Sequence, residues 1–142
     1  MNIVSVNDSN IYLLENFVRN IGEASKSFRY YNHRSIDVIK NHLVTLLLIE
    51  NNTPVAYGHL EPENNTTWLG ICVLPEYYRK GCGIKMMTAL IEKAKKLHLN
   101  SIYLTVDIKN ENAIKLYHKF HFCRTDSNEN HYKYSLQIIP AK

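Results

Sequence analysis

The sequence predicts a mixed α/β fold with a central, mostly antiparallel twisted sheet of six to seven strands and about four flanking helices. Two observations lead to this fold class. Three strand-like segments between residues 44 and 74 follow one another with only short turns between them, which is typical of an antiparallel meander. The full order of elements, β-α-α-β-β-β-α-β-α-β-β, is not the run of βαβ units that a doubly wound parallel sheet requires. A length of 142 residues favours one domain, residues 1–142.

The first third of the chain predicts one strand and two helices. Residues 2–6, NIVSV, alternate between apolar and polar side chains and are expected to form a short strand. Residues 7–10, NDSN, supply side chains that cap helices well. The apolar side chains of the helix that follows share one face: Leu14, Phe17, Val18 and Ile21. A second short helix is expected from residue 36, with Ser35 as its cap.

The middle third predicts the meander. Residues 44–50, VTLLLIE, are apolar on both faces, which indicates a central strand. Residues 55–61, VAYGHLE, alternate as a strand does. One face of this strand is expected to hold Val55, Tyr57, His59 and Glu61. Residues 68–74, WLGICVL, form the third strand of the meander.

The last third predicts two helices and three strands. The first helix follows Gly81 and is expected to turn one apolar side to the sheet. That side holds Ile84, Met87, Leu90, Ile91, Ala94 and Leu97. Residues 101–107 form a strand, and Asn110 is placed to cap the next helix. The segments FHF (120–122) and HYKYSLQII (131–139) are expected to supply the last strands.

The composition limits the classes of function. A formal charge of +4 and a pI of about 8.9 are compatible with a small basic pocket but fall short of the dense basic surface of a nucleic-acid-binding protein. The three cysteines have no zinc-site spacing, and we interpret them as free thiols in a reducing compartment. No signal-peptide pattern and no run of about 18 apolar residues is present. A cytoplasmic location, with no membrane, nucleic-acid or metal partner, is therefore expected.

The stretch PEYYRKGCGIKMM, residues 75–87, indicates an anion site. Gly81 and Gly83 allow a sharp turn whose backbone N–H groups can point into one concavity. The helix that follows offers unpaired N–H groups and the positive end of its dipole, and Arg79 and Lys80 add charge. Together these features favour binding of a phosphate group. An ordinary strand-to-helix turn would explain the two glycines alone.

Two blocks of sequence resemble the GNAT superfamily of acyltransferases. VLPEYYRKGCGIKMMTALIEKAK is similar to the family's acyl-CoA-binding motif, Val-x-Pro-x-(Tyr/Phe)-(Arg/Gln)-x-x-Gly-x-(Gly/Ala). VDIKNENAIKLYHKFHF resembles V-x-x-x-N-x-x-A-x-x-L-Y-x-K-x-G-F. Two positions differ from the family pattern: Tyr78 stands at the Arg/Gln position, with Arg79 one place later, and His121 replaces a glycine that often adopts a positive φ.

The resemblance implies acetyl-CoA, or another acyl-CoA, as co-substrate and no metal. It also implies a V-shaped split between the fourth and fifth strands, in which the pantetheine arm pairs with one strand and a backbone N–H near Val73 faces the acyl oxygen. The residues expected to bind the co-substrate are Ile71, Cys72, Val73, Tyr78, Arg79, Lys80, Gly81, Cys82, Gly83, Ile84, Asn110, Ala113 and Tyr117.

The resemblance also implies direct attack of an amine on the thioester. Tyr117 matches the motif tyrosine and is expected to protonate the leaving thiolate, although a core aromatic would also fit this position. His59 and Glu61 lie on the strand beside the expected site and are both candidates for the base. The alternatives are a water chain as the base, a hydrogen-bonded strand role for His59 and a turn-facing role for Glu61.

The acceptor site is expected in the aromatic and basic segment around residues 23–42. Its candidate residues, with one from the end of a strand, are Phe28, Tyr30, Tyr31, Arg34 and Asp107. This chemistry favours a small-molecule amine, for example a nucleotide-linked amino sugar. A protein N-terminus or lysine is the alternative acceptor, and a non-catalytic CoA-binding domain is the alternative class. A homodimer formed through the last strands is possible.

Overall fold

The structure, a computed structural model, describes residues 1–138, so the expected end of the last strand at Ile139 and the end of the domain at residue 142 lie outside the described residues. Seven strands form one sheet in the order β1-β2-β3-β4-β5-β7-β6. The strands are β1 (Asn2–Ser5), β2 (Val44–Glu50), β3 (Thr53–Glu63), β4 (Thr66–Val73), β5 (Ser101–Asp107), β6 (Cys123–Ser127) and β7 (His131–Gln137). Neighbouring strands are antiparallel except for β4 and β5, which are parallel. The expected mixed, mostly antiparallel sheet is confirmed.

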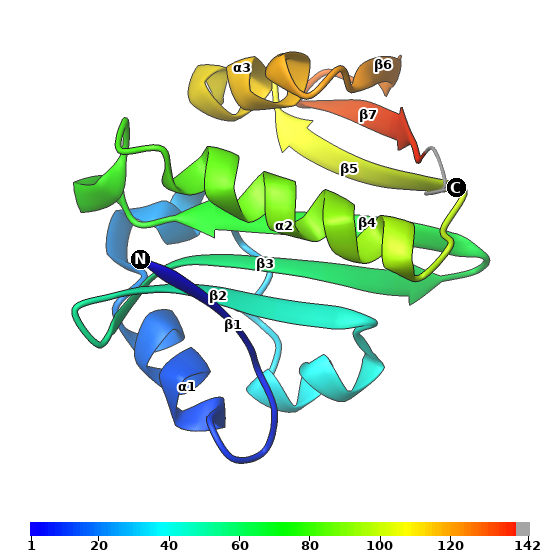
Figure 1. Cartoon of the computed structure of the whole chain (residues 1–142). Coiled ribbons are helices and arrows are strands. Elements are labelled where there is room, and N and C mark those ends of the chain that lie inside the picture. Colours follow the sequence, from blue (N-terminus) through cyan, green and yellow to red (C-terminus); the bar gives the residue numbers. More distant parts are fainter. Residues whose placement is uncertain (139–142) are drawn as a thin grey trace.

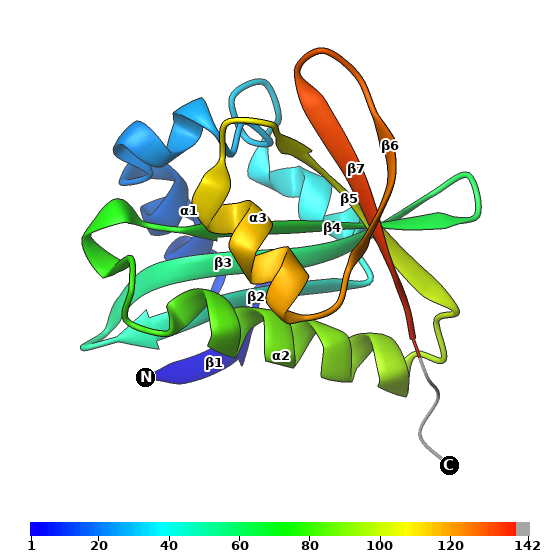
Figure 2. The same cartoon turned by 90° about the horizontal axis from the view of Figure 1, so that it is seen from above.

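Helices cover both faces of this sheet, as Figures 1 and 2 show. The α-helices are α1 (Ile11–Arg19), α2 (Cys82–Lys96) and α3 (Glu111–Lys119), and the short 3-10 helices are η1 (Gly22–Lys26), η2 (Ile36–Asn41) and η3 (Pro75–Tyr77). Leu14 and Phe17 of α1 are buried on one face with Tyr57 of β3. Met86 and Leu90 of α2 are buried on the opposite face. The two faces of the central strands therefore pack into two separate apolar clusters.

The sheet splits between β4 and β5. Trp68 and Tyr103 are the pair at which these two strands face each other, and both lie near the start of their strands. Beyond that pair the strands diverge, which is visible in Figure 2 as the angle between β4 and the β5–β7 pair. The expected V-shaped split is therefore confirmed, and it opens toward the C-terminal ends of β4 and β5. Among residues 1–138, no strand lies beside the backbone edge of Ile71–Val73 that faces β5.

Three local expectations were wrong. Val55 does not share a face with Tyr57, because the register shifts between Leu48 and Ile49, opposite Pro54, and Val55 packs in the same cluster as Ala56. Pro54 has no N–H to give to the ladder, which favours such an irregularity. On the first long helix, α2, the side chains of Ile84 and Leu97 are exposed, while Cys82 and Met86 are buried instead.

The boundaries of two other elements also differ from expectation. The second helix is a 3-10 helix of six residues, although Ser35 does accept a hydrogen bond from the backbone N–H of Asp37 at 3.2 Å. The segment FHF ends helix α3 and its turn, and the strand begins one residue later, at Cys123. His121, which stands at the glycine position of the motif that the second sequence block resembles, adopts a φ of 68°. Within residues 1–138, no helix has the length and apolarity that crossing a membrane requires.

Candidate active site

A cleft of about 650 Å³ runs along the split in the sheet. Its two walls come from β4, residues 69–73, and from the end of β5, Thr105–Asp107. The turn before α2 and the first residues of that helix line one end, and α3 contributes Ala113, Leu116 and Tyr117. The loop after η1 and the polar residues of β3 line the other end. The cleft therefore joins the glycine turn to the aromatic segment of the N-terminal third.

The glycine turn presents the N-terminus of α2 to the cleft. Arg79 and Gly81 both have a positive φ, 63° and 80°, so the chain reverses sharply before Cys82 begins the helix. The N–H of Lys85 donates to the carbonyl of Gly81 at 3.0 Å, which closes the first turn of the helix. The N–H groups before Lys85 precede that bond, and they stay available to a ligand together with the positive end of the dipole.

Gly83 has a different reason to be glycine. A Cβ atom there would lie 3.2 Å from Cδ2 of Leu116, so α2 and α3 approach each other closely at this point. Gly81, by contrast, has open space around its Cα and is required by its positive φ. The two glycines of the motif therefore serve backbone conformation and helix packing respectively.

Most of the residues predicted from sequence for the co-substrate site do line the cleft. Lys80 does not, and its Nζ lies 5.1 Å from the centre of the Tyr77 ring. Asn110 lines the cleft and also accepts a hydrogen bond from the N–H of Ala113 at 3.3 Å, so its capping role is confirmed. Tyr78 is partly exposed at 43% and lines the cleft wall.

Tyr117 is buried but reaches the cleft. Its exposed fraction is 5%, and its ring packs between Phe122 and Tyr134 at centroid distances of 5.7 and 6.1 Å. Burial, with a smaller contribution from Cys72, raises the pKa of the phenol above its ordinary value. Tyr117 is therefore protonated at neutral pH, as a proton donor must be.

His59 lies on β3 directly opposite Gly70 of β4. A Cβ atom on Gly70 would lie 2.4 Å from Cε1 of His59, so the imidazole occupies the space that a side chain at position 70 would take. Nδ1 of His59 is 2.6 Å from the hydroxyl of Tyr57, and the ring is 3% exposed where it lines the cleft. Burial lowers the pKa of His59, so the ring is neutral at pH 7.

Glu61, Tyr30 and His42 form a second polar group beside His59. The hydroxyl of Tyr30 donates to Oε2 of Glu61 at 3.0 Å and lies 2.7 Å from Nε2 of His42. Because Tyr30 has a single hydrogen, Nε2 of His42 must donate to it, and Nδ1 then accepts from the hydroxyl of Thr45 at 2.8 Å. The groups form a continuous chain of hydrogen bonds, Thr45 to His42 to Tyr30 to Glu61, that ends at a carboxylate in the cleft.

His42 was missed from the sequence. It precedes β2, and it comes beside Glu61 because Val44 pairs with Leu60 in the hairpin. The turn between residues 50 and 53 fixes the pairing of the two strands up to the register shift at Leu48 and Ile49, so the hairpin could have predicted the neighbourhood of His42 and Glu61 to within one residue. Burial lowers the pKa of His42 to about 4.

The predicted acceptor residues separate into two groups. Phe28, Tyr30, Arg34 and Asp107 line the cleft. Tyr31 does not: it is buried, its hydroxyl lies 2.7 Å from that of Tyr57, and burial raises its pKa to about 12. Tyr31 therefore supports Tyr57 from behind the cleft wall.

An ion pair that was not predicted connects the two sides of the cleft. Arg29, in the loop after η1, donates from Nη2 to Oδ1 of Asp107 at 2.9 Å and from Nη1 to Oδ2 at 3.2 Å. Nε2 of His131, at the start of β7, lies 2.9 Å from the same Oδ1 atom. All three residues line the cleft, so this end of it carries the Asp107 carboxylate held between two basic groups.

Comparison with known proteins agrees with this geometry. The model of the acetyltransferase (GNAT) family matches residues 10–122. N-alpha-acetyltransferase 50 of Danio rerio is 40% identical over 71 residues, which cover 49% of this chain but only 40% of that protein's length.

Two solved structures show the same fold at low identity. An acetyltransferase of the GNAT family from Streptococcus pneumoniae has a TM-score of 0.83 at 18% identity, covering 96% of this chain and 98% of that chain. PaiA N-acetyltransferase from Thermoplasma acidophilum, in complex with coenzyme A, has a TM-score of 0.74 at 19% identity, covering 96% and 99%. Since the family model spans residues 10–122, this protein belongs to the GNAT family of acetyltransferases.

Proposed function

We propose that the protein is an N-acetyltransferase that moves an acetyl group from acetyl-CoA to a primary amine of a small molecule. The observation that carries this proposal is the course of the cleft. It joins a glycine turn at a helix N-terminus, suited to a diphosphate, to a group of polar side chains around Glu61, and the buried phenol of Tyr117 lines the same cleft.

The co-substrate end fits coenzyme A by its donors. The N-terminus of α2 faces the cleft with backbone N–H groups that do not depend on side-chain type, and Arg79 adds charge. No strand of the described part of the chain lies beside the β5-facing edge of Ile71–Val73, and this edge can pair with an extended amide chain. Coenzyme A, when acetylated, supplies the activated thioester.

Two protons must move during direct transfer. As the amine nitrogen bonds to the carbonyl carbon, the bond from carbon to sulfur breaks and the thiolate needs a proton, which Tyr117 donates. The backbone N–H of Val73 stabilises the negative charge that develops on the carbonyl oxygen. The proton lost by the amine passes to Glu61, directly or through water, with His59 as the neighbouring neutral acceptor.

His42 acts as a positioning residue in this scheme. It holds the hydroxyl of Tyr30 at 2.7 Å, and Tyr30 in turn holds Oε2 of Glu61 at 3.0 Å. This chain of hydrogen bonds uses only Oε2 of Glu61, and no described residue forms a hydrogen bond with Oε1, which can therefore accept a proton from the acceptor amine.

The acceptor end favours a small, partly aromatic or anionic molecule. Phe28 and Tyr30 stack with a centroid distance of 6.1 Å, and the guanidinium of Arg34 lies 4.3 Å from the centre of the Tyr30 ring. Aromatic faces beside a cation suit a planar or phosphate-bearing acceptor such as a nucleotide-linked amino sugar. Asp107 is positioned to pair with a substrate ammonium when Arg29 is displaced.

The test is thiol release from acetyl-CoA with panels of amino sugars and of short peptides. Tyr117→Phe is expected to lower turnover at least about tenfold while leaving acetyl-CoA binding, measured as a concentration-dependent rise in Tm, nearly unchanged. Tyr12→Phe, the same chemical change on an exposed tyrosine of α1, is the matched control and keeps full turnover. Full turnover of Tyr117→Phe would remove Tyr117 from the mechanism.

A protein N-terminus is the second candidate acceptor. It is favoured by the 40% identity over 71 residues with a protein named as an N-alpha-acetyltransferase. Acetylation of peptides at the α-amine, with no turnover of any amino sugar, would decide for this acceptor. Tight binding of acetyl-CoA without thiol release on either panel would indicate a non-catalytic CoA-binding domain.

A further inference from the structure

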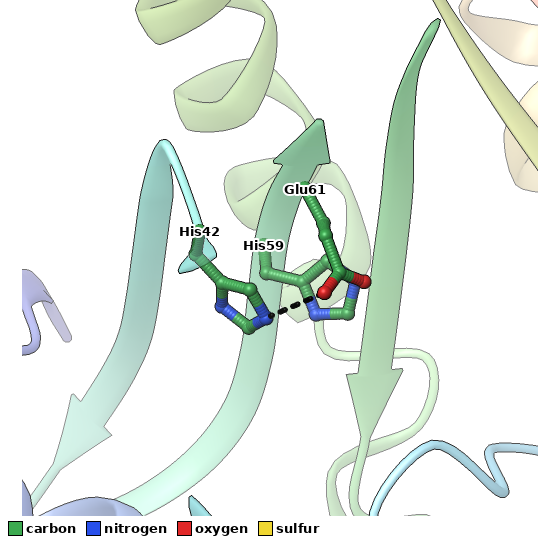
Figure 3. A group of neighbouring side chains, drawn as sticks. All are labelled: His42, His59 and Glu61. Carbon is green, nitrogen blue, oxygen red and sulfur yellow. Dashed lines mark ion pairs between the residues drawn. The ribbon is translucent and has the colours of Figure 1, made fainter. Parts of the chain in front are cut away.

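Three potential metal ligands converge at the acceptor end of the cleft. His42 lies just before β2, and His59 and Glu61 lie two residues apart on β3, so the fold brings together residues that the sequence separates (Figure 3). One ligand atom from each lies within 4.8 Å of the other two. Nε2 of His42 is 3.9 Å from Oε2 of Glu61, and the two imidazole centres are 4.5 Å apart.

The histidines are held as metal-binding histidines are held in other proteins. Nδ1 of His42 lies 2.8 Å from the hydroxyl of Thr45, and Nδ1 of His59 lies 2.6 Å from that of Tyr57. In the structure His42 carries its proton on Nε2, which donates to Tyr30. A hydroxyl can accept a hydrogen bond as well as donate one, so when an ion binds, the proton of His42 can move to Nδ1 and that of His59 can lie on Nδ1, with both rings in place. Each Nε2 then offers a lone pair with the ring orientation fixed from behind.

The Nε2 atom of His59 is available for this role. Within residues 1–138 no group forms a hydrogen bond with it, and the ring lines the cleft. Both rings are buried, which keeps them neutral at pH 7 and so able to act as ligands. Glu61, whose side chain is 20% exposed, supplies the negative charge.

We propose that His42, His59 and Glu61 form a binding site for a divalent ion of the zinc type, with the remaining coordination positions open to the cleft. Two imidazoles and one carboxylate suit Zn²⁺ or Co²⁺, whereas Mg²⁺ prefers oxygen ligands. One consequence rests on the proposed function: an ion on Glu61 and His59 occupies the group that takes the amine's proton, so zinc inhibits acetyl transfer reversibly.

Two neighbouring groups, the hydroxyl of Tyr30 and the guanidinium of Arg34, disfavour binding of the ion. The hydroxyl of Tyr30 bridges His42 and Glu61, and the ion takes over this bridging position. The guanidinium of Arg34 lies over the Tyr30 ring and repels a cation. Tyr30→Phe removes the hydroxyl but keeps the ring, so this variant is expected to bind zinc at least as tightly as the wild type.

The test is calorimetric titration of the tag-free, EDTA-stripped full chain with Zn²⁺, and with Mg²⁺ as the control ion. One zinc per chain is expected, with no heat from Mg²⁺. Glu61→Gln and His42→Ala should each weaken the binding at least about tenfold, since even the loss of a supporting group around a metal costs that much. His33→Ala, which removes an exposed histidine outside the cleft, is the matched control and should bind as the wild type does.

Co²⁺ gives an independent readout of the ligand set. The wild type should show visible d–d absorption without a thiolate charge-transfer band, which would distinguish this site from the exposed Cys123. The side chain of Glu61 is only partly buried, so Glu61→Gln should fold. Circular dichroism checks the folding of Glu61→Gln and of His42→Ala. The proposal is wrong if zinc binding survives in Glu61→Gln, is lost in His33→Ala, weakens in Tyr30→Phe or is absent from the wild type.

Failure of this inference differs from failure of the proposed function. Binding is measured without any acceptor or acetyl-CoA, so it is decided whether or not the protein turns over. If the active enzyme binds zinc through these ligands but keeps its full rate of acetyl transfer, zinc does not block the group that takes the amine's proton. Glu61 is then not the base.

Discussion

Acidification should destabilise the protein through His42. The side chain of His42 is fully buried, and burial lowers its pKa from 6.5 to about 4. In the unfolded chain His42 therefore binds a proton near pH 6.5, whereas in the folded chain it binds one only near pH 4. Stability rises with pH wherever the unfolded state binds more protons, so this contribution is lost as pH falls from 6.5 toward 4.

The size of the effect follows from the two pKa values. When His42 is protonated in the unfolded chain but not in the folded chain, the free energy of unfolding falls by up to about 3 kcal/mol. About 2 kcal/mol of this decrease occurs between pH 7 and pH 5. Glu61 acts in the opposite direction, because its Oε2 lies 3.9 Å from Nε2 of His42 and would attract a proton there. We expect burial to prevail, because the Tyr30 hydroxyl lies between the two groups and burial is the cause that lowers the pKa of His42.

The assay is urea unfolding at pH 7 and pH 5 in the presence of EDTA, for the wild type and for His42→Gln. The variant loses hydrogen bonds at both pH values, so the quantity of interest is the difference in unfolding free energy between the two pH values. That difference should be smaller in His42→Gln by about 2 kcal/mol.

His33→Gln is the control, since His33 is exposed, and it should leave the pH dependence unchanged. An equal pH dependence in the wild type and His42→Gln would show that His42 titrates normally in the folded chain. A wild type that loses less stability toward pH 5 than the variant would show that Glu61 raises the pKa of His42, and the reasoning from burial would be refuted.

Three further predictions follow from the packing of the cleft. Gly70→Ala should place a methyl group against His59, lower stability by about 1–3 kcal/mol in urea unfolding and reduce acetyl transfer, whereas unchanged stability would mean that the ring can move aside. Gly81→Val should lower the free energy of unfolding by about 1–3 kcal/mol, because valine is strained at the positive φ of this position, and should weaken acetyl-CoA binding in calorimetry. Wild-type affinity in this variant would show that the turn does not bind the diphosphate. Ellman's reagent at pH 8 should modify one thiol, the exposed Cys123, because Cys72 and Cys82 are buried and burial raises the pKa of both thiols, that of Cys72 to about 12. A Cys123→Ser variant should then be unreactive until it is denatured.

The sequence predicted the order of elements, the turn before α2 and the cap of α3 because all three depend on local patterns. The turn at Gly81 and the cap at Asn110 are short-range features, and each is fixed by residue types within one helical turn. The alternation of residues 55–61 was correct for Tyr57 and His59 but failed at Val55. A β-bulge changes the face of every residue on one side of it, and alternation alone cannot locate the bulge.

The end of the cleft that we propose binds the acceptor was only partly predictable because its contacts are long-range. Arg29 is 78 residues from Asp107 and 102 from His131, and no local period links them. His42 became a neighbour of Glu61 only through the register of a hairpin. The aromatic segment had no periodicity that could separate Tyr30, which faces the cleft, from Tyr31, which faces the core.

Trp68 is the single tryptophan in the sequence, and it sits at the pair with Tyr103 where the two halves of the sheet part. Its ring centre lies 6.0 Å from that of Tyr103 and 5.5 Å from Nζ of Lys133. Indole fluorescence responds to a nearby charge and to water, so Trp68 can report changes at the point where β4 and β5 diverge. A change in the angle between β4 and β5 when either substrate binds can be followed by intrinsic fluorescence, without attaching a dye.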